Sequence, residues 1–254
     1  MIDINDVSFA YGTKTVLNDI SLSIPSKSLT ALIGLNGAGK STLLSCLAKQ
    51  KEISNGQITV NGKSIGSYSY RAYSRLVSVV PQISSLIQFD GKVRDYLVEG
   101  RTPYLSAFAV PGKKDYIFSE KNAHKMGIGG LLDLDFAKLS GGEQQLVVLT
   151  RALIQDTPII LLDEPMSALD LKNQAFFLKI IKQLSDEGKT VLFSTHNPNH
   201  ALLLKCDVVM MKDGSITCHD KAVHCLTQIN ISNVFGDEVH LIENEFGSSA
   251  VLKL

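Results

Sequence analysis

The stretch LTALIGLNGAGKST, residues 29–42, constrains the fold of this chain more than any other segment. Its near-continuous apolar start is typical of a strand that is covered on both faces of a sheet. The loop that follows matches the pattern G-x-x-x-x-G-K-[ST], with Gly34, Gly39, Lys40 and Ser41 at the defining positions. Such glycines let successive backbone N–H groups turn toward phosphate oxygens, and the helix expected after the loop adds the positive end of its dipole. Unless this is an ordinary strand–turn–helix loop, Lys40 neutralises the β and γ phosphates of a nucleotide and the Ser41 hydroxyl ligates Mg²⁺.

Two acids end a second apolar run, IILLDE, at residues 159–164. A carboxylate at the end of a buried strand is costly unless a cation compensates it, and Mg²⁺ beside the phosphates would do so. We interpret Asp163 as the acid on the metal side. Glu164, one residue further, points elsewhere and is interpreted as the general base that polarises the attacking water. The alternative is that both acids are exposed strand-end residues, or that Glu164 only caps a helix.

A second helix start with the features of an anion site lies at LSGGEQQLVVLTRAL, residues 139–153. Ser140 and Glu143 form a capping-box pattern, and helix capping is a sufficient structural reason for these two residues. It does not explain Gly141 and Gly142, because each glycine in a first helical turn costs about 1 kcal/mol against alanine. Close approach by an anion is the natural reason. Since Gly34–Ser41 already serves one nucleotide, we expect this start to contact the nucleotide of a second copy.

The remaining sequence predicts a mixed α/β fold. The alternating runs IDINDVSFAY and VLNDISLSI are typical of antiparallel strands. We expect hairpin turns at Asn55-Gly56 and Asn61-Gly62, on either side of QITV, and another at Asp213-Gly214. Residues 92–138 favour a mostly helical insert.

The second half of the chain adds two more buried strands and a crossover helix. The strands are predicted in PIILLDE and TVLFSTH, residues 158–164 and 190–196. Between them an apolar face repeats at helical spacing, at Phe177, Ile180, Ile181 and Leu184.

Composition excludes several classes of protein. The 254 residues include 25 Lys plus Arg and 25 Asp plus Glu, so no global basic field favours nucleic acid as a partner. No apolar run reaches the roughly 18 to 20 residues needed to cross a bilayer. The four cysteines lack CxxC spacing, and no charged-then-apolar signal segment opens the chain. We therefore expect a cytosolic protein with reduced thiols at Cys46, Cys206, Cys218 and Cys225.

Taken together, these motifs identify the chain as similar to the ATP-binding subunits of ABC transporters, over essentially its whole length. GLNGAGKST resembles the Walker A motif of that family, VVPQ its Q-loop, LSGGEQQ its signature, IILLDEP its Walker B motif, SALD its D-loop and FSTH its H-loop. The resemblance implies an α/β P-loop NTPase of the ABC type. It predicts one ATP-binding domain over residues 1–254, with a mixed sheet core, an antiparallel N-terminal β subdomain and a helical subdomain at about 92–155.

The resemblance also implies a homodimer in which two copies face head to tail. Each ATP would be clamped between one subunit's Walker A loop and the signature of the other, so that the dimer closes on binding and opens on hydrolysis. The implied nucleotide contacts are Tyr11, Gly34, Asn36, Gly37, Ala38, Gly39, Lys40, Ser41, Thr42, Ser140, Gly141, Gly142 and Asp170.

The implied catalytic residues are Lys40, Gln82, Glu164 and His196, and the implied Mg²⁺ ligands are Ser41, Gln82 and Asp163. Tyr11 would stack on adenine, unless it is an ordinary half-buried strand tyrosine. Asp170 would couple the two sites, a role compatible with its capping the next helix. Gln82 and His196 could likewise be a plain turn glutamine and a structural histidine.

Weaker similarities point to one kind of transporter. VEGRTPYLSAF, residues 98–108, and LTQINISNVFGDEV, residues 226–239, resemble segments of ATPases that serve importers of ferric siderophores, haem and cobalamin. We therefore expect ATP-driven import of a metal chelate, foremost a ferric siderophore, with cobalamin, haem or molybdate import as alternatives. The implied partners are two transmembrane permease subunits and, indirectly, a solute-binding protein. The chain would lie peripherally on the cytoplasmic face of the inner membrane.

Two other classes of function use the same nucleotide site. A soluble ABC ATPase of DNA repair or translation is disfavoured by the absence of a basic signal and by the single ATP cassette. A purely regulatory nucleotide-binding module is disfavoured because Glu164 and His196 are both present.

Overall fold

The computed structural model describes residues 1–254 except 83–88, 107, 168, 245–246 and 254. A four-stranded antiparallel sheet has the order β2-β1-β4-β5 and comprises β1 (Ile2–Tyr11), β2 (Lys14–Ile24), β4 (Asn55–Val60) and β5 (Lys63–Ser64). A six-stranded sheet has the order β10-β9-β3-β8-β7-β6 and comprises β3 (Leu29–Ile33), β6 (Val77–Val80), β7 (Ile159–Leu162), β8 (Thr190–Thr195), β9 (Asp207–Lys212) and β10 (Ser215–Lys221). A C-terminal hairpin pairs β11 (Val239–Asn244) with β12 (Gly247–Leu252).

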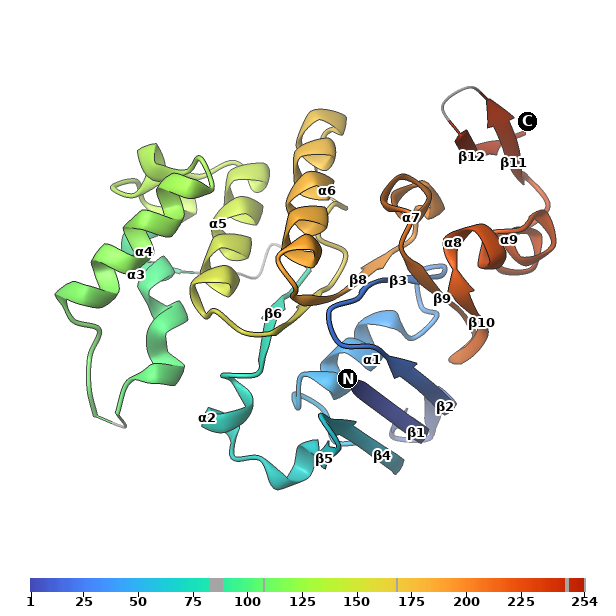
Figure 1. Cartoon of the computed structure of the whole chain (residues 1–254), viewed down its shortest axis with the longest axis horizontal. Helices are drawn as coiled ribbons and strands as arrows, with labels where there is room; N and C mark the ends of the chain where they lie inside the picture. Colours follow the sequence, from blue (N-terminus) through green and yellow to red (C-terminus); the bar gives the residue numbers. More distant parts are fainter. Residues whose placement is uncertain (83–88, 107, 168, 245–246, 254) are drawn as a thin grey trace.

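The helices are distributed around these sheets (Figure 1). They are α1 (Lys40–Leu47), α2 (Tyr70–Tyr73), α3 (Val93–Val98), α4 (Lys113–Lys125), α5 (Gly141–Ile154), α6 (Leu171–Asp186), α7 (Pro198–Leu204), α8 (Ala222–Cys225) and α9 (Gln228–Phe235). None of the helices in the described part of the chain has the length and apolar character that a bilayer span requires.

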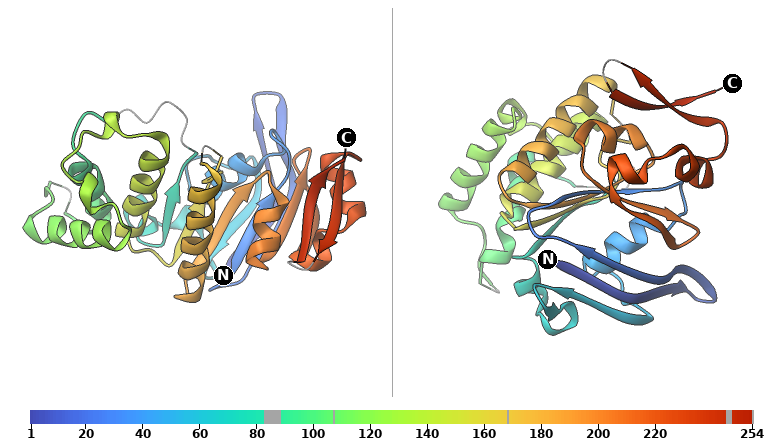
Figure 2. Two further views of the ribbon diagram at one scale, coloured as in Figure 1. Left: turned by 90° about the horizontal axis from the view of Figure 1, so that it is seen from above. Right: turned by 45° about the vertical axis from the view of Figure 1, so that its right-hand side comes forward.

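Helix α1 lies between the two large sheets, as Figure 2 shows. Its Leu43, Leu44 and Leu47 share one apolar cluster with residues of both sheets, which include Ile4 of β1 and Leu192 of β8. The alternating burial of β1 arises because one face of the antiparallel sheet packs on this cluster. The start of α1 is therefore held rigidly from both sides.

Strand β3 lies inside the six-stranded sheet and is buried at every residue, as its apolar run predicts. It runs parallel to β8 on one side and to β9 on the other, while β10 closes the edge antiparallel to β9. Helix α6 connects β7 to β8 and buries its predicted face against the sheet. Because the carboxyl ends of parallel strands meet at one edge, the loops after β3, β7 and β8 converge there.

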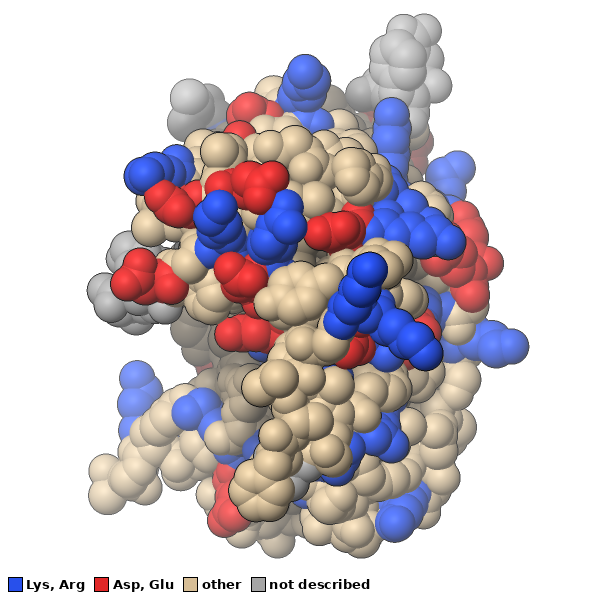
Figure 3. All heavy atoms as spheres, turned by 90° about the vertical axis from the view of Figure 1, so that its left-hand side faces the viewer, with Lys and Arg blue, Asp and Glu red and all other residues tan. Residues whose placement is uncertain are grey.

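The segment from α3 to α5 is mostly helical, as predicted, and forms a lobe of its own beside the sheets (Figure 1). Its aromatic centre includes Tyr96 and Phe136, with ring centroids 4.6 Å apart. Figure 3 shows this lobe end on: basic and acidic side chains alternate over one part of it, and an uncharged strip covers another.

The prediction of a hairpin turn at Asn55-Gly56 is wrong, whereas Asn61-Gly62 does turn between β4 and β5. Asn55 and Gly56 lie inside β4 and pair with β1, where the register shifts between Asn5 and Ser8. A Cβ on Gly56 would lie 2.3 Å from the carbonyl oxygen of Asp6. Glycine is therefore required at this position because the two backbones approach closely at a bulge. This cause lies in the tertiary structure, and the dipeptide Asn55-Gly56 does not reveal it.

The expectation of four reduced thiols is also wrong for two of the cysteines. Cys218 of β10 and Cys225 of α8 form a disulfide, while Cys46 and Cys206 are free and buried. Burial raises the pKa of the Cys46 thiol to about 11. Cys218 and Cys225 are seven residues apart in the sequence, and the short helix α8 folds back toward β10 and brings the two together.

Candidate functional site

The glycine loop between β3 and α1 has the conformation expected of a phosphate cradle. Gly39, the residue before α1, adopts φ of 102°, a left-handed conformation that favours glycine. Gly34 is required by a close approach, because a Cβ there would lie 2.4 Å from the carbonyl oxygen of Met211 on β9. The loop can therefore present its backbone N–H groups only with glycine at these two positions.

Lys40 is only 4% exposed, and its ammonium group lies under the loop. It donates hydrogen bonds to the carbonyl oxygens of Gly34 and Leu35 at 2.9 and 3.0 Å. Its counterion is Glu164, with 3.3 Å between Nζ and Oε1. A buried charge needs such compensation, and Glu164 supplies it.

Glu164 also contacts His196, and so connects the lysine to the H-loop. Oε2 of Glu164 lies 3.3 Å from Nδ1 of His196, which follows β8 and is 52% exposed. Glu164 itself is 9% exposed and has φ of 42°, a conformation that is uncommon for a residue with a side chain. Backbone strain of this kind persists where the surroundings enforce it, often at functional sites.

Asp163, the neighbouring acid, faces the other way, as predicted. Its Oδ1 accepts hydrogen bonds from Ser41 Oγ at 2.9 Å and from Ser194 Oγ at 2.6 Å. Ser194 in turn accepts the backbone N–H of Glu164 at 2.8 Å. Ser194 is a site residue that was not predicted, although a serine inside the apolar run TVLFSTH was a usable signal. Its hydroxyl fixes both acids relative to each other.

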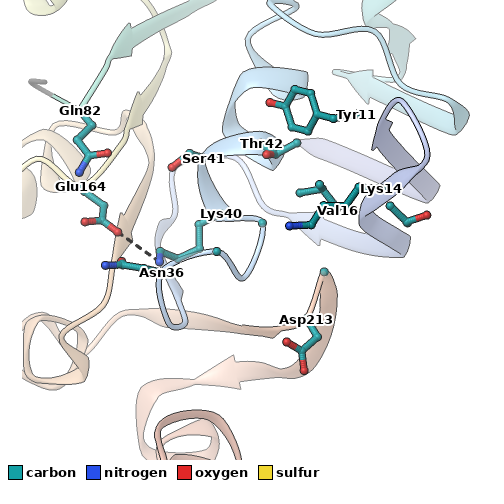
Figure 4. Close-up of a pocket in the computed structure, with 14 residues that line it drawn as sticks. Tyr11, Lys14, Val16, Asn36, Lys40, Ser41, Thr42, Gln82, Glu164 and Asp213 are labelled. Atoms are coloured by element: carbon teal, nitrogen blue, oxygen red, sulfur yellow. Dashed lines mark ion pairs between the residues drawn. The ribbon is translucent and has the colours of Figure 1, made fainter. Parts of the chain in front are cut away.

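These groups open into a cavity of about 740 Å³, shown in Figure 4. Tyr11 at the end of β1 lies on one side and Gln82 after β6 on the other, with Lys40, Ser41 and Thr42 between them. Tyr11 is 51% exposed and packs edge-on against Phe9 with ring centroids 4.9 Å apart. Further predicted nucleotide contacts that line the cavity are Asn36, Gly37 and Gly39.

Lys14 and Asp213 also line this cavity and were not predicted. Lys14 begins β2 directly after the turn from β1, and Asp213 lies in the predicted turn between β9 and β10, but no sequence pattern places either residue at a site. Ala38 is 6% exposed and Gly34 is backed by β9, so these two shape the loop from within.

The second predicted anion site lies elsewhere in the chain. Among the described residues that line the cavity, none comes from Ser140–Gly142. Ser140 caps α5 and forms the capping box with Glu143, whose carboxylate accepts the Ser140 hydroxyl and backbone N–H at 2.7 and 2.9 Å. Both hydrogen bonds lower the pKa of Glu143, and the one from the Ser140 hydroxyl has the larger effect. Gly141 is exposed and a Cβ there would meet no atom within 4 Å, so this subunit does not itself require glycine at that position.

Asp170 caps α6 by accepting the backbone N–H of Asn173 at 2.8 Å. The structural interpretation of this aspartate is therefore confirmed, and its coupling role stays a prediction. His196 and Gln82 are both partly open to solvent next to Glu164 and the phosphate loop.

Comparison with known proteins accounts for this arrangement. The family model described as "ABC transporter" matches residues 17–167. A Helicobacter pylori protein described as an iron chelatin transport ATP-binding protein is 33% identical over 244 residues, 95% of each chain. The hemin import ATP-binding protein of Thermobifida fusca is 32% identical over 238 residues, 94% of this chain and 83% of that relative.

Among solved structures, one described as a metal-chelate type ABC transporter in an inward-facing conformation resembles the chain. Its TM-score is 0.84 at 26% identity, over 100% of this chain and 97% of that one. The alignment covers the whole chain and therefore includes both large sheets and the helical lobe. The chain therefore belongs to the ABC transporter family, as an ATP-binding domain that hydrolyses ATP.

Proposed function

We propose that the cavity around Lys40 holds ATP, with its phosphates on the loop Gly34–Thr42 and its adenine stacked on Tyr11. The supporting observation is the buried ion pair between Lys40 and Glu164, 3.3 Å long, which compensates a charge that a triphosphate would otherwise neutralise. When phosphate oxygens approach Lys40, Glu164 loses its role as counterion. It then becomes free to accept a proton from water.

The donor set beside this loop fits Mg²⁺. Ser41 Oγ and Asp163 Oδ1 lie 2.9 Å apart, and Gln82 lines the same cavity. No group of three or more His, Cys, Asp or Glu side chains that could hold a metal occurs in the described ranges. The hydroxyl of Ser41 beside the single carboxylate of Asp163 suits Mg²⁺, which keeps several waters and binds through one or two carboxylates plus substrate phosphates. Bound there, Mg²⁺ would supply charge stabilisation to the phosphates.

In hydrolysis, Glu164 would act as the general base and His196 would hold the attacking water and the γ-phosphate. Their contact of 3.3 Å supports this division of roles, because it keeps the carboxylate aimed at the exposed imidazole. Gln82, on the opposite side of the cavity from Tyr11, would sense the γ-phosphate and the metal. Lys40 would neutralise charge on the β and γ phosphates throughout.

The signature helix would complete a partner's site. Ser140, Gly141 and Gly142 lie at an exposed, capped helix start, outside the cavity of their own chain. A head-to-tail homodimer would place them over the partner's γ-phosphate, and the helical subdomain of about residues 92–155 would carry them there. Asp170 would couple the two sites. ATP would thus close the pair, and hydrolysis would open it.

The transport function that we propose is import of a metal chelate, foremost a ferric siderophore. It rests on the relative described as serving iron chelatin transport, 33% identical over 95% of both chains. The hemin import relative, at 32%, makes haem the second candidate. Cobalamin and molybdate import are weaker alternatives. Two permease subunits would span the membrane, a solute-binding protein would deliver the ligand, and this chain would sit on the cytoplasmic face.

Affinity isolation of the chain from native membranes tests the proposal, because the ligand does not touch this chain. We expect two permease copies and a solute-binding protein whose purified form binds a ferric siderophore. Binding of haem but not of ferric siderophores by that protein would replace the proposed ligand. Recovery of the chain with ribosomes or DNA-repair proteins, and without any membrane protein, would overturn the transport function.

A further inference from the structure

A buried histidine, His200, lies directly behind the H-loop and has no part in the chemistry proposed above. It belongs to the first turn of α7 and is 6% exposed, whereas His196 is 52% exposed. His196 reaches solvent and touches Glu164 through a single contact of 3.3 Å. A side chain that is half exposed has little packing to hold its direction, so its direction must be set by the backbone that carries it.

Both ring nitrogens of His200 engage the residues on either side of His196. Nδ1 lies 2.9 Å from Thr195 Oγ1, and Nε2 lies 3.5 Å from the side-chain nitrogen of Asn197. Thr195 Oγ1 also accepts the backbone N–H of Asn197 at 3.0 Å. One tautomer satisfies all of these contacts: Nδ1–H donates to Thr195, and Nε2 accepts from Asn197.

His200 also lines a small cavity beside Glu164 and His196. A small cavity of about 60 Å³ is lined by His200, His196, Glu164 and Ser194, among others, and it is large enough for ordered water. Burial, and secondarily the neighbouring His196, lower the pKa of His200 to about 4, so the ring is neutral at neutral pH. A neutral ring can both donate and accept, as the contacts to Thr195 and Asn197 require.

We propose that His200 is a positioning residue for ATP hydrolysis: by holding Thr195 and Asn197, it fixes the peptide that presents His196 to Glu164. The inference rests on the role proposed for His196. In this proposal His200 contacts neither ATP nor the attacking water. Its effect should therefore fall on turnover, and nucleotide binding should be spared.

Four variants of the full chain test the proposal. His200→Leu keeps the bulk but removes both hydrogen-bonding nitrogens, and His200→Asn restores a polar group at the Nδ1 position. His196→Ala tests the underlying role. Leu203→Ala changes a residue of the same helix that is 70% exposed, and it is the matched control. For each, kcat and KM for ATP, nucleotide affinity by titration and the thermal unfolding midpoint are measured.

We expect His200→Leu to lower kcat by on the order of ten- to a hundred-fold, because small misplacements near reacting groups have effects of that size. KM and nucleotide affinity should stay within about two-fold, which is below the smallest single-contact loss. His200→Asn should recover most of the loss, and Leu203→Ala should behave like the parent. In chains with ¹³C-labelled histidine, the His196 resonance should shift in the Leu variant and return in the Asn variant.

The outcomes distinguish a failure of the role proposed for His196 from a failure of the role proposed for His200. If His196→Ala leaves turnover unchanged, the proposed role of His196 fails. If His196→Ala lowers turnover, but His200→Leu leaves both turnover and the His196 resonance unchanged, the positioning role fails. A loss of kcat in the Leu variant without recovery in the Asn variant, together with a lowered unfolding midpoint in both, reduces His200 to a packing residue and overturns the proposal.

Discussion

Replacing Glu164 by glutamine separates the two roles of this side chain, because the amide keeps the shape and loses the charge. The parent carboxylate is 9% exposed and lies 3.3 Å from Lys40 Nζ. Removing one partner of a buried ion pair costs about 3–5 kcal/mol. Lys40 keeps its two carbonyl acceptors, Gly34 and Leu35, and glutamine retains a neutral acceptor oxygen. The free energy of unfolding of the ATP-free chain should therefore fall by about 1.5–3 kcal/mol, the contribution of one hydrogen bond to a charged group.

Binding and turnover should respond to Glu164→Gln in opposite ways. In the parent, phosphate must displace Glu164 from Lys40, and in the variant that competition is weaker, so ATP affinity should be equal or higher. Turnover should fall by about 10²–10⁴-fold, the usual contribution of a general base. ATP should also restore the lost stability, since phosphate oxygens replace the missing counterion.

Three measurements decide this prediction: steady-state ATP turnover, direct nucleotide titration, and urea unfolding with and without ATP. Glu187→Gln makes the same change at an exposed position after α6 and serves as the control. Turnover at the parent rate in Glu164→Gln would refute the assignment of the base. A loss of ATP affinity would refute the idea that Glu164 and phosphate compete for Lys40.

Three further predictions concern other parts of the site. Lys40→Ala should weaken ATP binding by about 10-fold or more, since a hydrogen bond to a charged group contributes about 1.5–3 kcal/mol, and an unchanged titration would contradict the phosphate assignment. Ser140→Arg should leave ATP binding to one subunit intact but abolish ATP-dependent dimerisation in light scattering, because the clash lies in the partner's site; persistent dimers would count against the head-to-tail arrangement. The third follows from the lowered pKa of His200, about 4 against 6.5 when unfolded: the unfolded chain takes up a proton that the folded chain refuses, so His200 costs about 2 kcal/mol of stability between pH 7 and pH 5. Unfolding of the parent should therefore depend more steeply on pH than that of His200→Asn over this range, and parallel curves would show that His200 titrates normally.

Much of the fold could be predicted because its signals are local. The apolar run of β3, the glycines after it and the repeat on α6 each depend on neighbours a few residues away, and the structure confirms all three. Two equally local inferences failed. Gly56 is required by the close approach of the β1 backbone at a bulge, and Cys225 forms a disulfide with Cys218 only because α8 folds back. In both cases the partner belongs to another element, which a pattern in one stretch does not contain.

The same division holds at the site. The sequence by itself determined which residue types the chain can offer to a phosphate: a lysine after a glycine loop, and acids at the end of a buried strand. Only the tertiary structure decided that Lys40 is paired with Glu164. It also decided that Asp163 accepts hydrogen bonds from both Ser194 and Ser41, the latter 122 residues away, and that His200 contacts Thr195 next to His196. The physical reason is that a motif specifies the chemistry a segment can offer, whereas a buried charge or hydrogen bond is satisfied by whichever atom the packed sheet places within reach.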